Sequence, residues 1–183
     1  MNLHSKILII GTSGSGKSTL ARDLARRLQL ADIELDALYW QANWTPVGAS
    51  LFRDRVENAI NSHSAWVMNG NYLEVKDLSW GNARQLIWLD YSLFTVMWRV
   101  IKRSLLRGIK KEKLWAGNTE TLKNNFFSKD SIILWAWQTY ALRKKQYAEM
   151  IADPAYCHLH VLRFKTPAAL ESYLEGLKKQ GSL

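Results

Sequence analysis

A glycine-rich loop near the N-terminus places the strongest constraint on what this chain can fold into. Residues 11–18 read GTSGSGKS and match the pattern G-x-x-x-x-G-K-[S/T]. The loop follows a short apolar run, residues 6–10, which is typical of a strand buried on both faces. It precedes leucines at four-residue spacing with arginines between them, which indicates an amphipathic helix. A chance glycine–serine loop is the alternative, and the strand–loop–helix context argues against it.

The residue types in this loop suit the phosphates of a nucleoside triphosphate. Glycines allow the backbone to wrap around a phosphate without Cβ clashes, while consecutive N–H groups and the helix N-terminus supply positive potential. Lys17 is expected to reach the β- and γ-phosphates, and the Ser18 hydroxyl to bind Mg²⁺. We therefore expect ATP and Mg²⁺ as cofactors. The cofactor-binding residues expected in the loop are Gly11, Gly14, Ser15, Gly16, Lys17, Ser18 and Thr19.

Apolar runs alternate with helical patterns along the rest of the chain. This alternation calls for right-handed crossovers, and it predicts an α/β, three-layer P-loop NTPase fold with a five-stranded parallel sheet. The further strand patterns cover residues 31–35, 65–68, 85–89 and 158–164. The further helical patterns cover residues 51–60, 93–106, 131–150 and 167–178, and residues 40–50 are expected to form a loop.

Length and composition indicate a single domain, residues 1–183. Hydrophobic residues make up 48% and charged residues 22% of the chain, an ordinary balance for a globular protein. The longest apolar segment, residues 131–142, is too short to span a bilayer, and residues 1–10 lack a secretory-signal pattern. The single cysteine excludes an intramolecular disulfide. We therefore expect a cytoplasmic protein without a membrane partner, and we assign no oligomeric state.

Positive charge is concentrated in one stretch of the sequence. The net charge is +9, which favours negatively charged partners, and residues 99–113 hold seven Lys or Arg against one Glu. We interpret this compositional break, about residues 99–130, as a helical lid or insertion over the site. Arg99, Arg103 and Arg107 stand four residues apart and align on one helix face. We expect Arg103 and Arg107 to clamp the phosphoryl group, with a solvated helix face as the alternative.

Acidic residues that follow predicted strands are candidates for chemistry, because ligands of open α/β sheets bind beyond the carboxyl ends of the strands. Asp36 is followed by Tyr39, Trp40 and Trp44. We expect Asp36 to orient an acceptor for attack on the γ-phosphate, with a loop cap as the alternative. Asp90 ends an apolar run and is expected either near Mg²⁺ or as the cap of the next helix. The metal candidates are therefore Ser18, Asp36 and Asp90.

Two groups of residues, one of Cys and His and one of Trp, are expected to have structural roles. Cys157, His158 and His160 lie together at the last predicted strand, where one strand face is a better explanation than a metal site. Five of the nine tryptophans lie within strand or helix patterns and are expected in the core, namely Trp66, Trp88, Trp98, Trp135 and Trp137.

Several segments together resemble a known family. The sequence resembles the adenylate-kinase-like P-loop kinases, and within them the group labelled DNA topology modulation proteins. The matching segments are residues 9–20, 35–40 with Trp44, 69–72, and Leu89-Asp90 with the arginine-rich helix, which together span nearly the whole chain. The resemblance implies a nucleoside-monophosphate-kinase-like fold, an arginine-rich lid and ATP-dependent phosphoryl transfer.

The resemblance also implies roles at particular positions. Similar proteins usually have aspartate where this chain has Asn69, and that position often carries a water-mediated Mg²⁺ contact. The neutral amide weakens the expected metal site and leaves Asp36 or Asp90 to compensate. By the same resemblance the turn at residues 163–166 lies against the adenine, so Arg163 and Lys165 are expected to contact the nucleotide.

Three functions are compatible with these features. The leading hypothesis is a kinase with a small-molecule acceptor, because residues 40–64 offer only Arg53 and Arg55 to hold a monophosphate such as AMP. The alternative is a nucleotide-dependent regulator that binds nucleic acid, for which residues 143–145, Arg-Lys-Lys, are the one candidate second basic surface. A degenerate fold that binds ATP without turnover is the third, motivated by Asn69.

Overall fold

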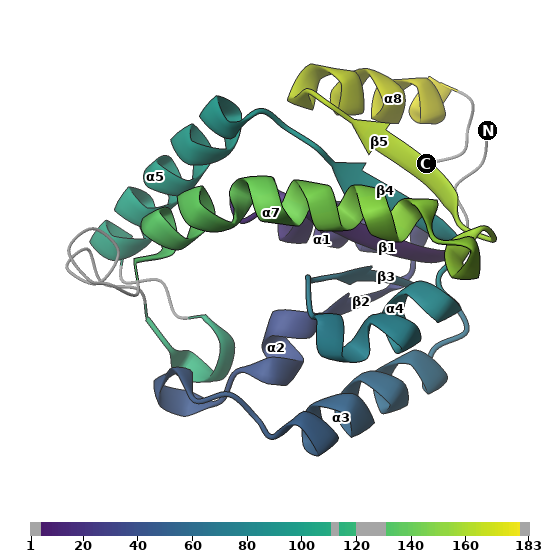
Figure 1. Ribbon diagram of the computed structural model, residues 1–183, viewed down its shortest axis with the longest axis horizontal. Helices are drawn as coiled ribbons and strands as arrows, with labels where there is room; N and C mark the ends of the chain where they lie inside the picture. The colour runs from purple at the N-terminus through teal and green to yellow at the C-terminus, as the bar shows by residue number, and fades with distance from the viewer. Residues whose placement is uncertain (1–4, 111–113, 120–130, 180–183) are drawn as a thin grey trace.

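Five parallel strands form the centre of the protein, whose computed structural model describes residues 5–110, 114–119 and 131–179 (Figure 1). They lie in the order β2-β3-β1-β4-β5, and every neighbouring pair is parallel. The prediction of a five-stranded parallel sheet is confirmed. The strands are β1 (Lys6–Gly11), β2 (Ala31–Glu34), β3 (Trp66–Asn69), β4 (Gln85–Leu89) and β5 (His160–Phe164).

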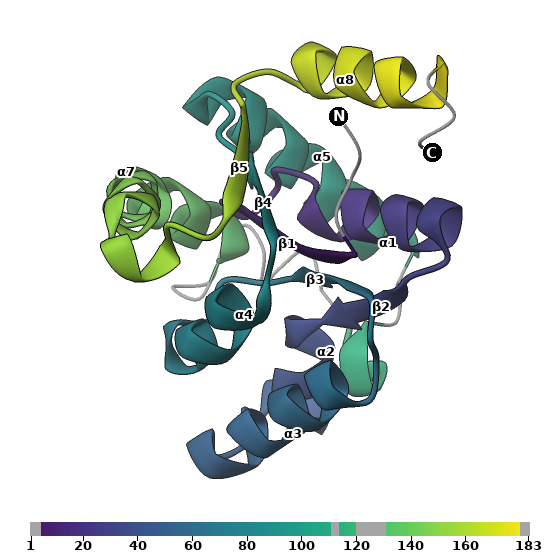
Figure 2. The ribbon, with the colours of Figure 1, turned by 90° about the vertical axis from the view of Figure 1, so that its right-hand side faces the viewer.

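Helices cover both faces of this sheet, which gives the predicted three layers (Figure 2). In β1 the side chains of Leu8 and Ile10 point into one layer, whereas Ile7 and Ile9 point into the other, and all four are at most 1% exposed. The first layer contains α3 (Ala49–Asn61), α4 (Lys76–Asn82) and α7 (Ile132–Ala152). The second contains α1 (Lys17–Leu28), α5 (Leu93–Lys110) and α8 (Pro167–Lys179).

The strand order reverses at β1, which places a ligand crevice at the carboxyl end of this strand. Strands β2 and β3 lie on one side of β1, and β4 and β5 lie on the other. Ligands of open α/β sheets bind at such a reversal. The register pairs Ile9 with Asn69 and Gly11 with Leu89, so β3 and β4 end beside the start of the glycine-rich loop. The fold therefore brings the loop, Asn69 and the end of β4 to one place.

Several short elements were not predicted. They are α2 (Leu35–Tyr39), α4, and the 3₁₀ turns η1 (Ala42–Trp44), η2 (Leu73–Val75), η3 (Trp115–Gly117) and η4 (Pro154–Tyr156). None is longer than the seven residues of α4, too short for a helical period to emerge from the sequence. Strand β5 begins at His160 instead of residue 158, because η4 and a turn occupy the residues before it.

The prediction that five tryptophans belong to the core is wrong for three of them. Trp66 and Trp88, which lie in strands, are 0% and 3% exposed. Trp98 on α5 is 63% exposed, and Trp135 and Trp137 on α7 are 40% and 59% exposed. A strand in the middle of a three-layer fold is covered on both sides, whereas a covering helix buries only the stripe that faces the sheet.

The basic stretch predicted as a lid begins inside a helix of the fold. Residues 99–110 belong to α5, whose buried Val96 and Val100 pack in the second layer. Residues 114–119 contain η3, whereas residues 111–113 and 120–130 lie outside the described part of the chain, so the lid stays a prediction. No described helix has the length and hydrophobicity needed to cross a lipid bilayer.

Candidate active site

The loop between β1 and α1 forms a cradle for an anion. Gly16 caps α1 in the left-handed region, at φ 97°, and leaves the first N–H groups of the helix open toward the loop. Gly14 has φ 80°, and a Cβ there would lie 2.3 Å from Val100 Cγ2, so α5 approaches the loop closely. The Ser15 hydroxyl is buried and has no hydrogen-bond partner among the described residues. Open N–H groups and a free hydroxyl fit a phosphate group of ATP.

Lys17 lies inside the cradle that the loop forms. Its Nζ donates a hydrogen bond to the carbonyl oxygen of Thr12 at 3.0 Å. Burial lowers the pKa of Lys17 to about 8; the negative charge of Asp36 opposes this shift, while Arg103 and Arg143 add to it. The lysine therefore lies within electrostatic reach of both an acid and two further cations.

Ser18, the residue expected to bind Mg²⁺, contacts Asn69 through a side-chain hydrogen bond. Ser18 Oγ donates to Asn69 Oδ1 at 2.9 Å, and Asn69 is 1% exposed. The Asn69 amide nitrogen is buried without a hydrogen-bond partner among the described residues. No group of three or more His, Cys, Asp or Glu gathers in the described part of the chain. This donor set fits Mg²⁺, which is commonly held by few protein oxygens together with phosphates and water.

Asp36 lies in the first turn of α2, directly after β2, as the sequence predicted for a strand end. Its Oδ1 accepts a hydrogen bond from the Tyr72 hydroxyl at 2.5 Å, while Oδ2 has no hydrogen-bond partner among the described residues. Burial raises the pKa of Asp36, and the Tyr72 hydrogen bond and the charge of Lys17 act in the opposite direction. The side chain therefore has one oriented oxygen and one oxygen open to a ligand.

One large cavity, of about 1940 Å³, brings Lys17, Ser18 and Asp36 together. Its lining includes the loop from Ser13 to Thr19 and the side chain of Asp36. The aromatic residues after Asp36 line the same space. The aromatic lining residues are Tyr39, Trp40, Trp44, Tyr72, Tyr91, Trp115 and Trp135. A cavity of this size has room for a nucleotide and a small second substrate.

The three arginines of α5 all line this cavity, in agreement with their helical spacing. Arg99 Nη1 donates to the carbonyl oxygen of Ser15 at 3.1 Å, and its guanidinium lies 5.3 Å from the centre of the Tyr91 ring. Arg103 Nη2 donates to Ser13 Oγ at 3.4 Å. The structure thus brings the helix face to the phosphate loop, whereas the clamping role of Arg103 and Arg107 stays a prediction.

Arg143 is a further cavity residue that we did not predict. It lies on α7, and its Nη1 donates to the carbonyl oxygen of Asn71 at 3.5 Å. Its neighbours in sequence diverge from it: Lys144 pairs with Asp90, and Lys145 lies 3.8 Å from Glu149. The basic surface considered for nucleic acid therefore does not form from these three residues. The nearby cavity residues Trp135 and Gln138 share the helix face of Arg143, a pattern that a helical projection could have revealed.

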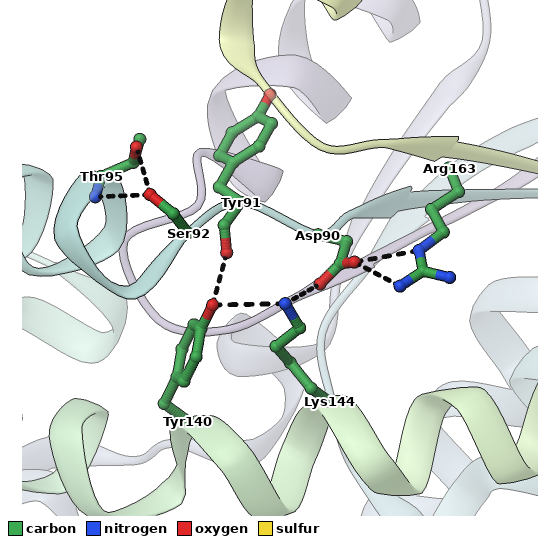
Figure 3. A network of polar contacts seen from close by, with 7 residues as sticks. All are labelled: Asp90, Tyr91, Ser92, Thr95, Tyr140, Lys144 and Arg163. Atoms are coloured by element: carbon green, nitrogen blue, oxygen red, sulfur yellow. Dashed lines mark hydrogen bonds and ion pairs between the residues drawn. The ribbon is translucent and has the colours of Figure 1, made fainter.

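Asp90 belongs to a network of polar contacts with α7 and β5 (Figure 3). Arg163 donates to Oδ2 through Nη2 at 2.6 Å and Nε at 2.9 Å, and Lys144 Nζ lies 2.8 Å from Oδ1. Lys144 also donates to the Tyr140 hydroxyl at 3.3 Å, which donates to the Tyr91 carbonyl at 2.8 Å.

This network does not favour the predicted role of Asp90 near Mg²⁺. Both of its oxygens face cations, its side chain is 2% exposed, and it is not among the residues that line the cavity. The alternative role as a helix cap is wrong, because Ser92 caps α5 by accepting from the Thr95 N–H at 3.3 Å. The structure indicates that Asp90 ties β4 to α7 and β5.

The nucleotide contacts expected at Arg163 and Lys165 after β5 stay a prediction. Arg163 lies over the Trp88 ring, 4.2 Å from its centre, and neither Arg163 nor Lys165 is among the cavity-lining residues. The first turns of α8 line the cavity instead, through Pro167, Leu170, Glu171 and Leu174. The side chains of β5 alternate between the faces of the sheet, and Arg163 lies on the side where it pairs with Asp90.

Comparisons with known proteins agree on the fold. No protein-family model matches the sequence. A shikimate kinase of Gloeobacter violaceus is 31% identical over an alignment 107 residues long, which covers 51% of this chain and 60% of the length of that relative. The solved shikimate kinase of Bacteroides thetaiotaomicron aligns with a TM-score of 0.51 and 16% identity, over 97% of this chain and 98% of its own.

A second solved structure gives the same result. The shikimate kinase of Acinetobacter baumannii, in complex with shikimate, aligns with a TM-score of 0.55 and 16% identity, over 96% of this chain and 92% of its own. At this identity the likeness concerns the fold, and it confirms the predicted fold of the adenylate-kinase-like, nucleoside-monophosphate-kinase-like P-loop kinases.

Proposed function

We propose that the protein transfers the γ-phosphoryl group of ATP to a hydroxyl group of a small molecule. The observation that carries this proposal is that the P-loop lysine and an oriented carboxylate, Asp36, line one cavity within electrostatic reach of each other. A phosphate cradle alone serves many nucleotide-binding proteins. A base beside it is what a hydroxyl acceptor requires.

The residues of the cradle would hold the phosphates and the metal ion. The N–H groups at the start of α1 and Lys17 bind the β- and γ-phosphates, and Ser18 with Asn69 holds Mg²⁺. Mg²⁺, when bound, offsets negative charge on the phosphates during transfer. Binding of the triphosphate favours the charged form of Lys17, which offsets the cost of its burial.

Asp36 is assigned the role of general base. The Tyr72 hydroxyl fixes one carboxylate oxygen, so the other, Oδ2, is aimed at the acceptor. The acceptor oxygen forms a bond to the γ-phosphorus while the bond to the β-phosphate oxygen breaks, and its proton passes to Asp36. The products are ADP and a phosphate ester. The raised pKa of Asp36 brings its basicity closer to neutral pH, as general-base catalysis requires.

Arginines from two helices would surround the transferred group. Arg99 is fixed by the loop carbonyl and the Tyr91 ring, so it positions the cradle. Arg103 and Arg107 from α5 and Arg143 from α7 line the cavity and supply positive charge. Cations at fixed positions stabilise the charge that develops in the transition state.

The relatives suggest which acceptor to test first. The Gloeobacter violaceus relative is named a shikimate kinase, and the Acinetobacter baumannii structure contains shikimate, a small hydroxylated acid. A small-molecule acceptor agrees with the few cations of the segment around α3, where Arg55 Nη1 donates to the Leu38 carbonyl at 3.0 Å and Arg53 pairs with Asp77. The finer resemblance to the DNA topology modulation proteins also stays a proposal, as does a location in the cytoplasm.

Steady-state release of ADP tests the proposed roles separately. We expect Lys17→Ala to lose both ATP binding and turnover, because it removes the charge that holds the phosphates. Asp36→Asn should keep the affinity for ATP and lower kcat by roughly 10²- to 10⁴-fold, the usual contribution of a general base. Equal turnover in wild type and Asp36→Asn at saturating ATP and acceptor would remove Asp36 from the mechanism.

A further inference from the structure

A chain of aromatic rings forms the wall of the cavity beyond Asp36. The centroids of Tyr39 and Trp40 lie 4.9 Å apart, those of Trp40 and Trp44 5.6 Å apart, and those of Trp44 and Trp115 6.2 Å apart. Each pair packs edge to face, which is a favourable geometry for aromatic rings. All four residues line the same cavity as Asp36. We call this row the aromatic wall.

Hydrogen bonds join the two segments that make up the aromatic wall. The side chain of Asn118 donates to the Gln41 carbonyl at 2.7 Å and accepts from the Trp44 N–H at 3.1 Å. Asn118 is 6% exposed, and its carbonyl accepts from the Leu114 N–H at 2.7 Å. The turn that carries Trp115 is therefore fixed to the loop that carries Trp44, so the position of both rings is set by the fold.

The side-chain polar groups of Trp44 and Trp40 in the aromatic wall already have partners within the protein. The Trp44 indole nitrogen donates to the Thr119 carbonyl at 3.4 Å. The Tyr72 hydroxyl donates to Asp36 and also interacts with the Trp40 side chain. A ligand that enters this part of the cavity meets ring surfaces, with the Asp36 carboxylate lining the same space. An acceptor with many hydroxyls would leave several of them unpaired against this wall.

We propose that the natural acceptor carries an aromatic or heteroaromatic ring in addition to the hydroxyl that is phosphorylated. The ring packs against Trp44 and Trp115, while the hydroxyl donates to Asp36. This inference rests on the proposed function, because it concerns the acceptor half of the same site. It makes Trp44 and Trp115 specificity-determining residues, which act on acceptor binding rather than on the phosphoryl transfer step.

Matched pairs of acceptors test this inference directly. Transfer of labelled phosphate from saturating Mg²⁺–ATP is measured for cytidine against methyl ribofuranoside, and for benzyl alcohol against cyclohexylmethanol. Members of each pair share the hydroxyl and differ in the unsaturated ring. We expect the ring-bearing member to have a kcat/KM higher by about tenfold or more, the range that one stacked ring contributes. Equal or higher kcat/KM for the saturated members, or for shikimate, would overturn the inference.

Variants of one tryptophan identify the part of the site responsible. Trp115→Leu should raise the KM of the preferred acceptor by about tenfold and leave kcat and the KM for ATP nearly unchanged. Trp115→Phe should restore most of the affinity, since it keeps an aromatic ring. Trp137→Leu is the matched control, because Trp137 is 59% exposed and is not a cavity residue. Equal kinetics for Trp115→Leu and Trp137→Leu would also overturn the inference.

The outcomes separate this inference from the proposed function. Lys17-dependent transfer to the saturated acceptors only would support the proposed kinase function and contradict the inference that the acceptor carries an aromatic ring. Lys17-dependent ATP turnover without transfer to either member of a pair would also contradict the inference of an aromatic acceptor. No Lys17-dependent turnover with any acceptor would reject the proposed function and the inference together.

Discussion

The ionisation of Lys17 gives a prediction about pH. In the free protein its pKa is lowered to about 8 by burial, so the positive charge is present below that pH and is lost above it. The kcat/KM for ATP reports the free protein and should therefore fall as pH rises through about 8. The bound phosphates favour the charged form, so kcat should stay level over the same range. A kcat/KM that stays level to well above this pH would contradict the account.

Asn69 gives a prediction about the metal ion. Replacing it with aspartate adds a negative charge beside Ser18, at the position where the amide nitrogen has no described partner. We expect Asn69→Asp to lower the Mg²⁺ concentration for half-maximal turnover by about tenfold, equivalent to ~1.4 kcal/mol. Without Mg²⁺–ATP the buried carboxylate should lower the Tm, because its charge is desolvated and unpaired.

The control for this change is Asn82→Asp, which adds the same charge at an exposed position on α4. It should alter neither the Mg²⁺ requirement nor the Tm to a comparable extent. An unchanged Mg²⁺ requirement in Asn69→Asp would remove Asn69 from the metal site.

Residues of the site could be predicted where their signal is local in sequence. The phosphate loop is a pattern of eight consecutive residues, and Asp36 lies two residues past the end of a strand. Arg143 reaches Asn71 across 72 positions, so its place depends on the rotation of α7 about its axis. The metal role expected of Asp90 stays a prediction, because a strand end is compatible with both metal binding and ion pairing. The choice depends on Lys144 and Arg163, which arrive from other elements.

The contact between the phosphate loop and α5 gives a prediction at the scale of elements. Gly14 has φ 80°, and a Cβ there would lie 2.3 Å from Val100 Cγ2 and 3.0 Å from the Val96 carbonyl oxygen. Gly14→Ala should lower the free energy of unfolding by about 1–3 kcal/mol, as overpacking does, and weaken ATP binding by displacing the loop from Arg99 and Arg103. Urea denaturation and ATP titration measure the two effects.

A second substitution separates the clash from the backbone strain. Val100→Ala combined with Gly14→Ala removes the closest contact, so part of the stability should return. Gly176→Ala on α8 is the control, because a Cβ there meets nothing within 4 Å and should cost no stability. A Gly14→Ala protein as stable as the Gly176→Ala protein would show that α5 does not press on the loop.

The elements differ in how well their sequence predicts them. The central strands β1, β3 and β4 are apolar runs buried on both faces, and all five strands were recognised within two residues of their bounds. The single turn of α2 and the 3₁₀ turns have no such signal, yet they position Asp36, Trp44 and Trp115. Exposure on α5 and α7 was also misjudged, because tryptophan content alone does not say which helix face meets the sheet.

For the whole molecule, the net charge of +9 gives a prediction about nucleic acid. We expect duplex DNA to bind weakly and without dependence on ATP, with affinity lost by roughly 200 mM salt, as for non-specific contacts with the backbone. Arg143→Ala should leave this binding unchanged, because Arg143 lines the cavity. Filter binding at graded salt concentrations measures the affinity of both proteins for duplex DNA. Tight binding that survives this salt and requires Arg143 would favour the regulator instead.

The whole fold was predictable in class but not in arrangement. Alternating strand and helix patterns predict a parallel sheet covered by helices on both faces, because strand–helix–strand connections are right-handed crossovers between parallel strands. The order β2-β3-β1-β4-β5 and the tie between residues 41–44 and 114–119 depend on contacts between distant segments. These contacts join the phosphate cradle and the aromatic wall into one cavity.

A phosphoryl-transfer assay tests most directly the central claim, that the protein is a kinase with a small-molecule acceptor. The assay follows transfer of label from γ-³²P-labelled ATP, with Mg²⁺ present, to a panel of nucleosides, sugars, aromatic alcohols and hydroxy acids including shikimate. Wild type and Lys17→Ala are compared under the same conditions. The account predicts a labelled phosphate ester that forms with wild type and is absent with Lys17→Ala. ATP binding by wild type without any labelled acceptor would contradict it, and the degenerate fold that binds ATP without transfer would then describe the protein.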